Sequence, residues 1–384
     1  MHRSHWLGVA AIAAASGVAG VAACGDLVIP QNAGDDGGGG GSDDGGGNDD
    51  GGGPLDARYD PDCDAGIPLA LACTGLYADW PTLTLAPDAH AYQPGASMWV
   101  DGATSLRWIW LPPGAKIDTT DPNNWVFPVG TKLWQELSLL GKRIETRFLW
   151  KEAPTLWFRT TYAWADDQNS APELTIGLPN ARGLPYEIPA VSACEKCHDG
   201  ANDFVLGFEA VGLSMPQSSG QNLVSLALQG LLTKVPTAGA SVPGDPTTSA
   251  SLAFLHANCG TSCHNRNTGA GAGQTGLFMK LTVDATGALP PTAQTTDTWL
   301  TAYKVPSVFT PGGSTATVTS AVTVGDGATG GAFYRLEPGD LAHSMIPWRA
   351  GRRDGVTQMP PIATHLVDEG DMQVLDAWVT ALPP

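Results

Sequence analysis

Positive charge is scarce in this sequence. Its 384 residues include 20 Lys and Arg against 38 Asp and Glu, and the formal net charge is −18. A chain this acidic repels phosphate backbones, so the composition argues against nucleic acid as a partner. Much of the excess lies in residues 25–56, a Gly- and Asp-rich segment with too few apolar residues to form a core. We predict that this segment is a disordered tether. It also lacks the apolar position of Gly- and Asp-rich calcium repeats, which argues against a calcium site there.

Strongly apolar runs are also scarce. The run from Trp6 to Ala23 approaches the length of a membrane span, but its Gly and Ala content makes it only weakly apolar. It follows Arg3 and ends in small residues, as a secretion signal does. The sequence VAAC resembles a bacterial lipobox, whose cysteine carries the lipid. We therefore expect residues 1–24 to be a lipoprotein signal peptide and Cys24 to anchor the protein in the cell envelope. The anchor would be periplasmic or on the outer surface. Simple secretion and an uncleaved anchor are the alternatives.

About 330 residues follow the tether, which is enough for two domains. Residues 57–190 are rich in tryptophan, with nine tryptophans between Trp80 and Trp164. Short apolar runs such as SLRWIWL and LWFRTTYAW are bounded by turn residues, so we predict an antiparallel β-sandwich or barrel. We expect its tryptophans to lie in the core, although a carbohydrate-binding platform is the alternative.

Residues 191–384 have a different pattern. Helical spacing is found at 221–232, at 251–259 and in the terminal DEGDMQVLDAWVTAL, which carries acidic residues in its first turn. Long Gly-, Thr- and Pro-rich stretches connect these segments. We predict a mainly α domain with large loops, so the expected fold class is a multidomain α+β protein.

Cysteine is infrequent, with seven in the chain. Apart from Cys24, the next two are Cys63 and Cys73, which are close enough in sequence to form a local disulfide. The remaining four form two close pairs, and each pair is followed directly by a histidine, in CEKCH (194–198) and CGTSCH (259–264).

A C-x-x-C-H motif has a mechanical explanation. One helical turn presents two thiols to the two vinyl groups of a haem, while the next residue directs an imidazole at the iron. The pattern predicts haem c at both motifs, the second being less regular because three residues separate its cysteines. A bulge or a tighter turn must absorb the extra residue. The predicted attachment residues and proximal ligands are Cys194, Cys197, Cys259 and Cys263, with His198 and His264.

Other uses of these cysteines remain open. A structural zinc site needs reduced thiolates, whereas an exported protein meets an oxidising compartment. Two disulfides, or redox-active cysteine pairs, do not explain why a histidine follows both pairs. We therefore favour haem.

Two methionines are candidate distal ligands. Met359 precedes two prolines, and a stiff Met-Pro loop can hold a thioether sulfur against the iron. Met215 also precedes a proline and is a candidate for the first haem, or else a packed core residue. Three arginines in PWRAGRRDG, namely Arg349, Arg352 and Arg353, are candidates to pair with haem propionates, since guanidinium groups bind carboxylates well. The alternative is that these arginines are solvated.

The order of these motifs carries a family resemblance. HANCGTSCHNRNTGAGAGQTGLFMKL, with the terminal MPP segment and helix, resembles a class I cytochrome c domain. The longer series VFPVGTKLWQEL, IETRFLW, WFRTTYAWADDQNSAPEL, YEIPAVSACEKCH and FLHANCGTSCHNR resembles bacterial exported dihaem c-type cytochromes of the SO_2930 type. This similarity runs from roughly Trp125 to the C-terminus. It implies a haem at each motif and an electron-transfer role. The chain departs from the pattern by the additional residue in its second motif.

These observations predict an exported lipoprotein that carries electrons through one or two covalently bound haems. Its acidic surface favours basic redox partner proteins, and its lipid would hold it at a membrane. The alternatives are a haem enzyme, such as a dihaem peroxidase with one displaceable ligand, and a cell-surface or carbohydrate-binding module whose cysteines form structural disulfides. An electron carrier fits the motifs better than a catalyst, because a six-coordinate haem has no open position for substrate.

Overall fold

The computed structural model describes residues 63, 67–237, 239, 241–311 and 333–384. Residues Asp56–Pro384 form one compact unit. The predicted signal peptide, the tether and Cys24 lie outside the described residues.

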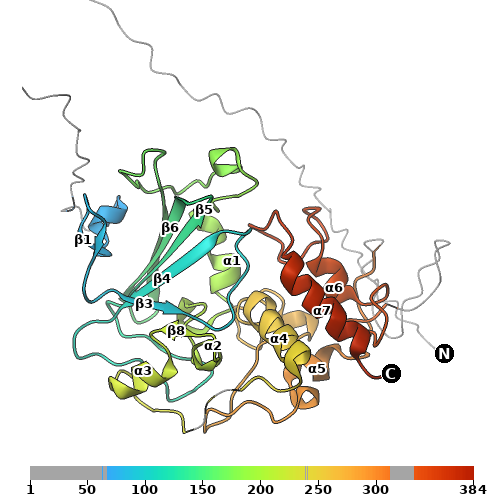
Figure 1. Ribbon diagram of the computed structural model, residues 1–384. Helices are drawn as coiled ribbons and strands as arrows, with labels where there is room; N and C mark the ends of the chain where they lie inside the picture. The colour runs from blue at the N-terminus through green and yellow to red at the C-terminus, as the bar shows by residue number, and fades with distance from the viewer. Residues whose placement is uncertain (1–62, 64–66, 238, 240, 312–332) are drawn as a thin grey trace, which may run out of the picture. The chain divides into compact units, whose positions relative to one another are not determined.

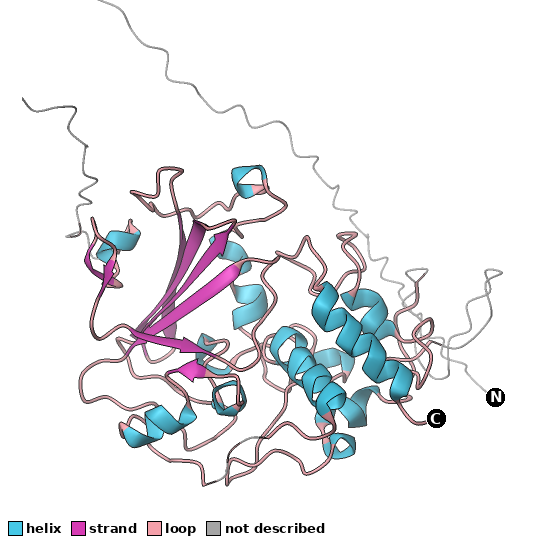
Figure 2. Ribbon diagram, viewed as in Figure 1, coloured by secondary structure: helices cyan, strands magenta, loops and turns pink. Residues whose placement is uncertain are grey.

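The main sheet of this unit has six antiparallel strands, and the helices of the last third of the chain lie to one side of it (Figures 1 and 2). The order of its strands is β7-β6-β5-β4-β3-β8, and two further strands, β1 and β2, form a small antiparallel sheet of their own. The bounds are β1 Tyr77–Asp79, β2 Thr84–Leu85, β3 His90–Gln93, β4 Thr104–Trp110, β5 Lys132–Leu139, β6 Lys142–Ala153, β7 Leu156–Ala163 and β8 Ser219–Gly220.

The predicted antiparallel sheet and the mixed α+β class are confirmed. The sandwich or barrel is not what the structure shows, because the large sheet is open, with β7 and β8 at its edges. The physical reason is that helices and loops, and not a second large sheet, cover its apolar faces (Figure 2).

One face of the sheet is aromatic. Trp108, Trp134 and Phe148 lie directly opposite one another on β4, β5 and β6 and are buried. Side chains opposite each other in an antiparallel sheet share a face, so these rings form a continuous row. Of the nine tryptophans between Trp80 and Trp164, five are buried and the other four are half-buried. This burial agrees with the predicted core role.

The other face, which we call the cavity face, packs against residues from the second half of the chain. Ile109 and Leu133 of the sheet share a hydrophobic cluster with Val205, Phe208 and Leu281. The strand β8 also comes from beyond residue 190, so the sheet and the first Cys-His motif belong to one packed body.

The helices follow the expected segments. α3, α4 and α7 confirm the helices predicted at 221–232, at 251–259 and at the C-terminus. α7 begins at its cap, Asp368, has Glu369 and Asp371 in its first turn, and buries Met372 and Trp378. The α-helices are α1 Glu195–His198, α2 Ala210–Ser214, α3 Leu223–Leu228, α4 Pro246–Leu255, α5 Asp297–Ala302, α6 Met345–Ala350 and α7 Glu369–Ala381. Short 3-10 turns are η1 Leu71–Cys73, η2 Ala181–Gly183, η3 Val191–Ala193, η4 Asn202–Phe204, η6 Gly273–Thr275 and η7 Ala293–Thr295, and η5, His256–Gly260, is a π-helical turn.

Two further features bear on the predictions. Cys63 and Cys73 are joined by a disulfide with an S–S distance of 2.10 Å, as predicted.

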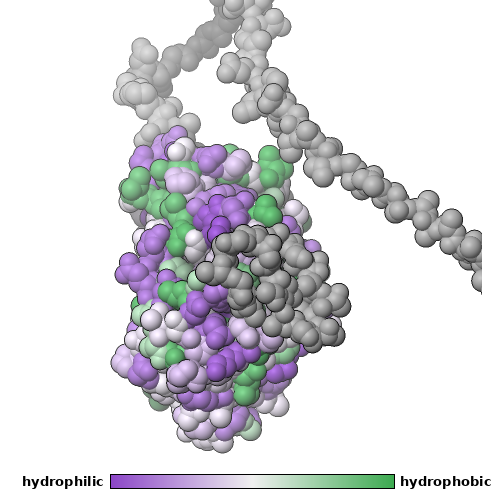
Figure 3. Space-filling model, turned by 90° about the vertical axis from the view of Figure 1, so that its right-hand side faces the viewer, coloured by the Kyte–Doolittle hydropathy of each residue, from purple (hydrophilic) through white to green (hydrophobic). Residues whose placement is uncertain are grey.

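Within the described part of the chain, no helix has the length and apolar character needed to cross a membrane. The face in Figure 3 shows hydrophobic residues scattered among hydrophilic ones.

Candidate functional site

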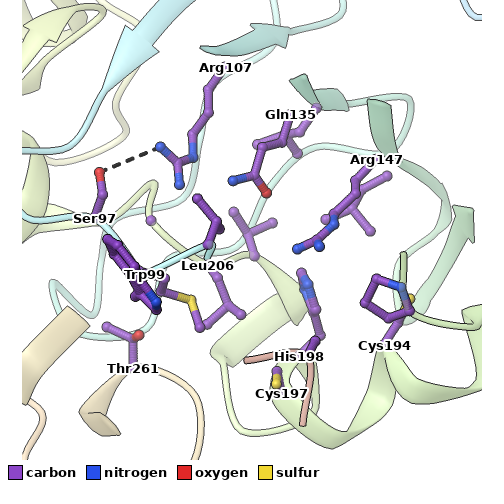
Figure 4. A pocket seen from close by; sticks show the side chains of 18 of the residues that line it. Ser97, Trp99, Arg107, Gln135, Arg147, Cys194, Cys197, His198, Leu206 and Thr261 are labelled. Carbon is purple, nitrogen blue, oxygen red and sulfur yellow. Dashed lines mark hydrogen bonds between the residues drawn. The ribbon is translucent and has the colours of Figure 1, made fainter. Parts of the chain in front are cut away.

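The first Cys-His motif forms one turn of helix against the cavity face of the sheet. The N–H of His198 donates to the carbonyl of Cys194 at 3.0 Å, which is the four-residue spacing of an α-helix. Cys194, Cys197 and His198 line one cavity with Met98 and Trp99. Figure 4 shows the two cysteines and His198 facing Arg147 across this cavity.

The imidazole of His198 is held in a defined orientation. Its Nδ1 donates to the carbonyl of Phe204 at 2.6 Å, and the Phe204 ring stacks on it with centroids 4.9 Å apart. Nε2 has no hydrogen-bond partner among the described residues. Burial lowers the pKa of His198 to about 4, so the ring is neutral near pH 7. A neutral imidazole whose Nδ1–H bonds a carbonyl is the form in which histidine binds metals.

The loop that carries Phe204 is anchored by a buried ion pair. The carboxylate of Asp203 accepts hydrogen bonds from Lys151 Nζ at 2.6 and 2.7 Å, and also from the N–H of Phe127 and from Trp157 Nε1. Lys151 and Asp203 are 1% and 7% exposed. Asp203 and Phe204 have φ values of 50° and 64°. Non-glycine residues rarely adopt this left-handed conformation, so the contacts of Asp203 help to hold the Phe204 carbonyl under His198.

The second motif absorbs its extra residue in a wider turn. Residues His256–Gly260 form a π-helical turn, and the N–H of Thr261 bonds the carbonyl of His256 at 2.9 Å. The N–H of His264 reaches back five residues to the carbonyl of Cys259 at 2.8 Å. The first cysteine and the histidine are therefore linked as in the first motif, despite the additional residue. Of the two possibilities predicted, the structure has the bulge and not the tighter turn.

His264 is oriented in the same way as His198. Its Nδ1 lies 3.2 Å from the carbonyl of Leu277, and burial lowers the pKa of the ring. Its Nε2 likewise lacks a hydrogen-bond partner in the part of the chain that is described. Two motifs of different length thus present a neutral imidazole with a free Nε2.

The two motifs are in direct contact. The thiol of Cys263 lies 3.7 Å from the carbonyl of Lys196. The buried Asn265 donates from Nδ2 to the carbonyl of Gly200 at 3.0 Å and to that of Gly260 at 2.8 Å. A Cβ on Gly200 would lie 1.5 Å from the carbonyl oxygen of Ser262, so the two loops meet backbone to backbone.

The four motif cysteines are free, and the surroundings of Cys194, Cys197 and Cys259 favour the thiol over the thiolate. Burial raises the pKa of Cys197 to about 11 and that of Cys259 to about 12, and it also raises that of Cys194. Zinc ligation and thiol–disulfide exchange both require thiolates. Among the described residues, no three His, Cys, Asp or Glu side chains converge where a metal ion could bind.

The residues of the first motif fit a covalently attached haem. The thiols and Nε2 of His198 face the same cavity, which is lined mainly by apolar side chains from the sheet and from the loops around it. The second motif offers the same donor set. A haem needs only one iron ligand from its motif, the histidine. A cluster of three metal-binding side chains is therefore not required.

The predicted distal ligands lie in different environments. Met215 is 4% exposed and packs against Gly95, whose Cβ would lie 2.2 Å from that of Met215. It is a core residue and lies outside the lining of the His198 cavity, in which Met98 is found. Met98, in GASMWV, has no proline or histidine beside it in sequence, so only the fold identifies it.

Met359 belongs to a loop near the second motif. Its N–H bonds the carbonyl of Arg349 at 3.0 Å, and the guanidinium of Arg349 is close enough to lower the pKa of His264 further. Pro360, the next residue, lines the cavity of the first motif. The MPP loop therefore runs between the two motifs.

Other histidines near the cavity are already bonded. Nε2 of His256 lies 3.3 Å from Glu209, and its Nδ1 accepts the N–H of Leu281 at 2.9 Å. His365 directs Nε2 at Glu187, 3.0 Å away. Both have structural partners, unlike Nε2 of His198.

No family model, curated protein or solved structure matches this chain in the comparisons made with known proteins.

Proposed function

We propose that this protein is an exported, lipid-anchored c-type cytochrome that transfers electrons through haem c attached at its two Cys-His motifs. The observation that carries the proposal is the shared geometry of His198 and His264. Each ring bonds a backbone carbonyl through Nδ1, neither Nε2 has a hydrogen-bond partner among the described residues, and each motif carries two free thiols. The resemblance of the motif order to dihaem cytochromes supports the same assignment.

Each side chain has a defined role in this proposal. Cys194 and Cys197 would form the thioether links of the first haem, and Cys259 and Cys263 would form those of the second. His198 and His264 would supply Nε2 to the iron. Bound haem would supply reversible one-electron chemistry. Met98 is the candidate distal ligand at the first site because it lines the cavity with His198. Met359 is the candidate at the second because its loop bonds Arg349 beside His264.

The cytochrome-like character of the second half belongs to this proposal. α4 leads directly into the π-helical turn of the second motif, and α7 packs against α4, with the hydroxyl of Ser251 3.4 Å from the carbonyl of Val374. A motif helix buttressed by a C-terminal helix is what the resemblance to class I cytochrome c implies. The contact between the motifs supports electron transfer from one site to the other.

The location and partners complete the proposal. Lipidation at Cys24 would hold the protein at a membrane of the cell envelope, and the acidic composition would favour basic redox proteins as partners. Nucleic acid is disfavoured by the same charge.

The test is expression in a host competent in cytochrome maturation, followed by pyridine haemochrome spectra and intact mass. The expected mass exceeds that of the polypeptide by two haems. Replacing Cys194 and Cys197 by Ala removes one haem, and replacing Cys259 and Cys263 removes the other. Ala substitution of Cys63 and Cys73 is the matched control, because it removes two cysteines without a motif and leaves the haem content unchanged.

An unshifted polypeptide mass contradicts the proposal. A full haem content with a high-spin spectrum and peroxide turnover would instead identify the haem-enzyme alternative, since a displaceable ligand is needed for that chemistry.

A further inference from the structure

Arg107 is a buried cation without a carboxylate partner. The residue is 7% exposed, and its guanidinium donates to Gln93 Oε1 at 2.9 Å and to Ser97 Oγ at 3.5 Å. No described Asp or Glu oxygen lies within 4.0 Å of it. Burial lowers the pKa of Arg107, which shows that its surroundings disfavour the charge. Buried charges in proteins are normally paired, so this group lacks a counter-ion.

Arg107 belongs to a polar row that crosses the sheet. It lies directly opposite Gln135 on β5, which lies opposite Arg147 on β6. Residues paired in this way share a face, and two inter-strand spacings place the Cα atoms of the arginines about 10 Å apart. Figure 4 shows Arg147 directed toward His198, while Arg107 is directed toward Ser97 on the other side of the same cavity.

Arg147 can bind an anion in addition to its present partner. One of its terminal nitrogens lies 2.8 Å from Glu145 Oε1, and Glu145 also accepts from Tyr186 and Thr161. The side chain of Arg147 remains 35% exposed because it faces the cavity. A guanidinium carries five donors, so N–H groups remain for a second acceptor.

The other charged groups of the cavity lining are compensated. Arg159 pairs with Glu195, while Glu187 and Glu209 each lie against a histidine. Arg107 is therefore the cation whose charge is left over.

We propose that Arg107 and Arg147 bind the two propionate carboxylates of the haem attached at Cys194 and Cys197. This inference rests on the proposed function. A group tethered to those thiols occupies the same cavity, so its carboxylates can reach the arginine row, and guanidinium groups bind carboxylates in paired hydrogen bonds. Of the propionate candidates named from the sequence, Arg349 donates to the carbonyl of Thr357, and Arg353 donates to those of Ala350 and Leu366. The third, Arg352, lies over the ring of Trp348.

The test compares Arg107→Gln and Arg147→Gln with Arg143→Gln in the mature holoprotein. Arg143 also lies on β6, but it pairs with Glu136 and lies over the ring of Trp164, away from the cavity. The readout is the reduction potential of the His198 haem and its pH dependence. Losing a cation beside a propionate should lower the reduction potential. The oxidised haem carries one more positive charge than the reduced haem, so removing a nearby positive charge stabilises the oxidised form. The loss should also raise the pKa of that propionate, so that the potential varies with pH nearer neutrality. Arg143→Gln should match the wild type in both respects.

Haem content separates this inference from the proposed function. Thioether links do not depend on the arginines, so all three variants should keep the wild-type haem content. If they do, while both cavity variants match Arg143→Gln in potential and pH dependence, the propionate site is overturned and the cytochrome assignment stands. If Arg107→Gln does not fold, Arg147→Gln tests the same lowered potential and shifted pH dependence, because its side chain is more exposed. Saturable succinate binding that is lost in Arg107→Gln, with an unchanged potential, would overturn the propionate assignment in favour of a free dicarboxylate.

Discussion

At the scale of single residues, the orientation of His198 depends on a group five residues away. Asp203 holds the loop through four hydrogen bonds, and the next residue supplies the carbonyl that bonds His198. The imidazole thus receives its geometry from Lys151 on the sheet, and not from the helical turn alone.

We expect Asp203→Asn to lower the free energy of unfolding by about 3–5 kcal/mol, because Lys151 would remain buried without its counter-charge. Urea denaturation measures this loss. Asp166→Asn is the control, since Asp166 also pairs with an arginine but is 92% exposed. It should cost less than about 1 kcal/mol. Equal losses for the two variants would show that the buried Lys151–Asp203 pair contributes no more to the free energy of unfolding than the exposed pair does.

At the scale of elements, the two motif turns behave as one packed unit. Gly200 follows the first motif, and its missing side chain lets the loop reach Ser262 of the second. Asn265 then ties the two loops together from a buried position.

Gly200→Ala should therefore lower the free energy of unfolding by about 1–3 kcal/mol, as overpacking of tight contacts does. Gly271→Ala is the matched control, because a Cβ there meets nothing within 4 Å. Thermal or chemical unfolding of both variants gives the comparison. A Gly200→Ala protein as stable as Gly271→Ala would mean that the loops separate without cost.

Glu209, which caps the N-terminus of α2, should make the free energy of unfolding sensitive to acid. Burial raises the pKa of Glu209, but His256 and the N–H groups of Val211 and Gly212 outweigh this and lower it below its usual value. The folded state then binds fewer protons than the unfolded state near pH 4.5. The contribution of Glu209 is therefore present above that pH and is lost as the pH falls through the lowered pKa.

Glu209→Gln should flatten the loss of stability between about pH 4.5 and more acidic values, since Gln does not titrate. Urea unfolding at a series of pH values measures the slope. Glu152→Gln, at an exposed position, controls for the loss of one carboxylate. An identical slope for Glu209→Gln and the wild type would contradict the prediction.

At the scale of the whole molecule, composition and packing act on different properties. The net charge of −18 bears on association with partners. The fold brings β3–β8, both motifs and the MPP loop into one unit, in which the cavity is lined by residues from Tyr92 to Thr364.

The proposed cytochrome function predicts that electron transfer to a basic redox protein slows as ionic strength rises, because salt screens the attraction between opposite charges. Stopped-flow reduction between about 10 mM and 1 M salt, where the Debye length falls from about 30 to 3 Å, measures this. An acidic partner of similar potential is the control and should show the opposite trend. A salt-independent rate with the basic partner would show that the acidic charge lies away from the docking surface.

The sequence by itself determined the features that depend on local spacing. The period of apolar residues specified an antiparallel sheet and the terminal helix. The two Cys-His motifs predicted haem attachment, since one turn of chain places two thiols and an imidazole together. Tertiary structure alone decided how the sheet is covered, because an open sheet and a closed barrel share the same alternation along each strand. It also decided which residues from distant strands and loops meet His198. Met98 and the row of Arg107, Gln135 and Arg147 line the same cavity as His198 because of strand register and chain folding, neither of which leaves a signal in neighbouring residues.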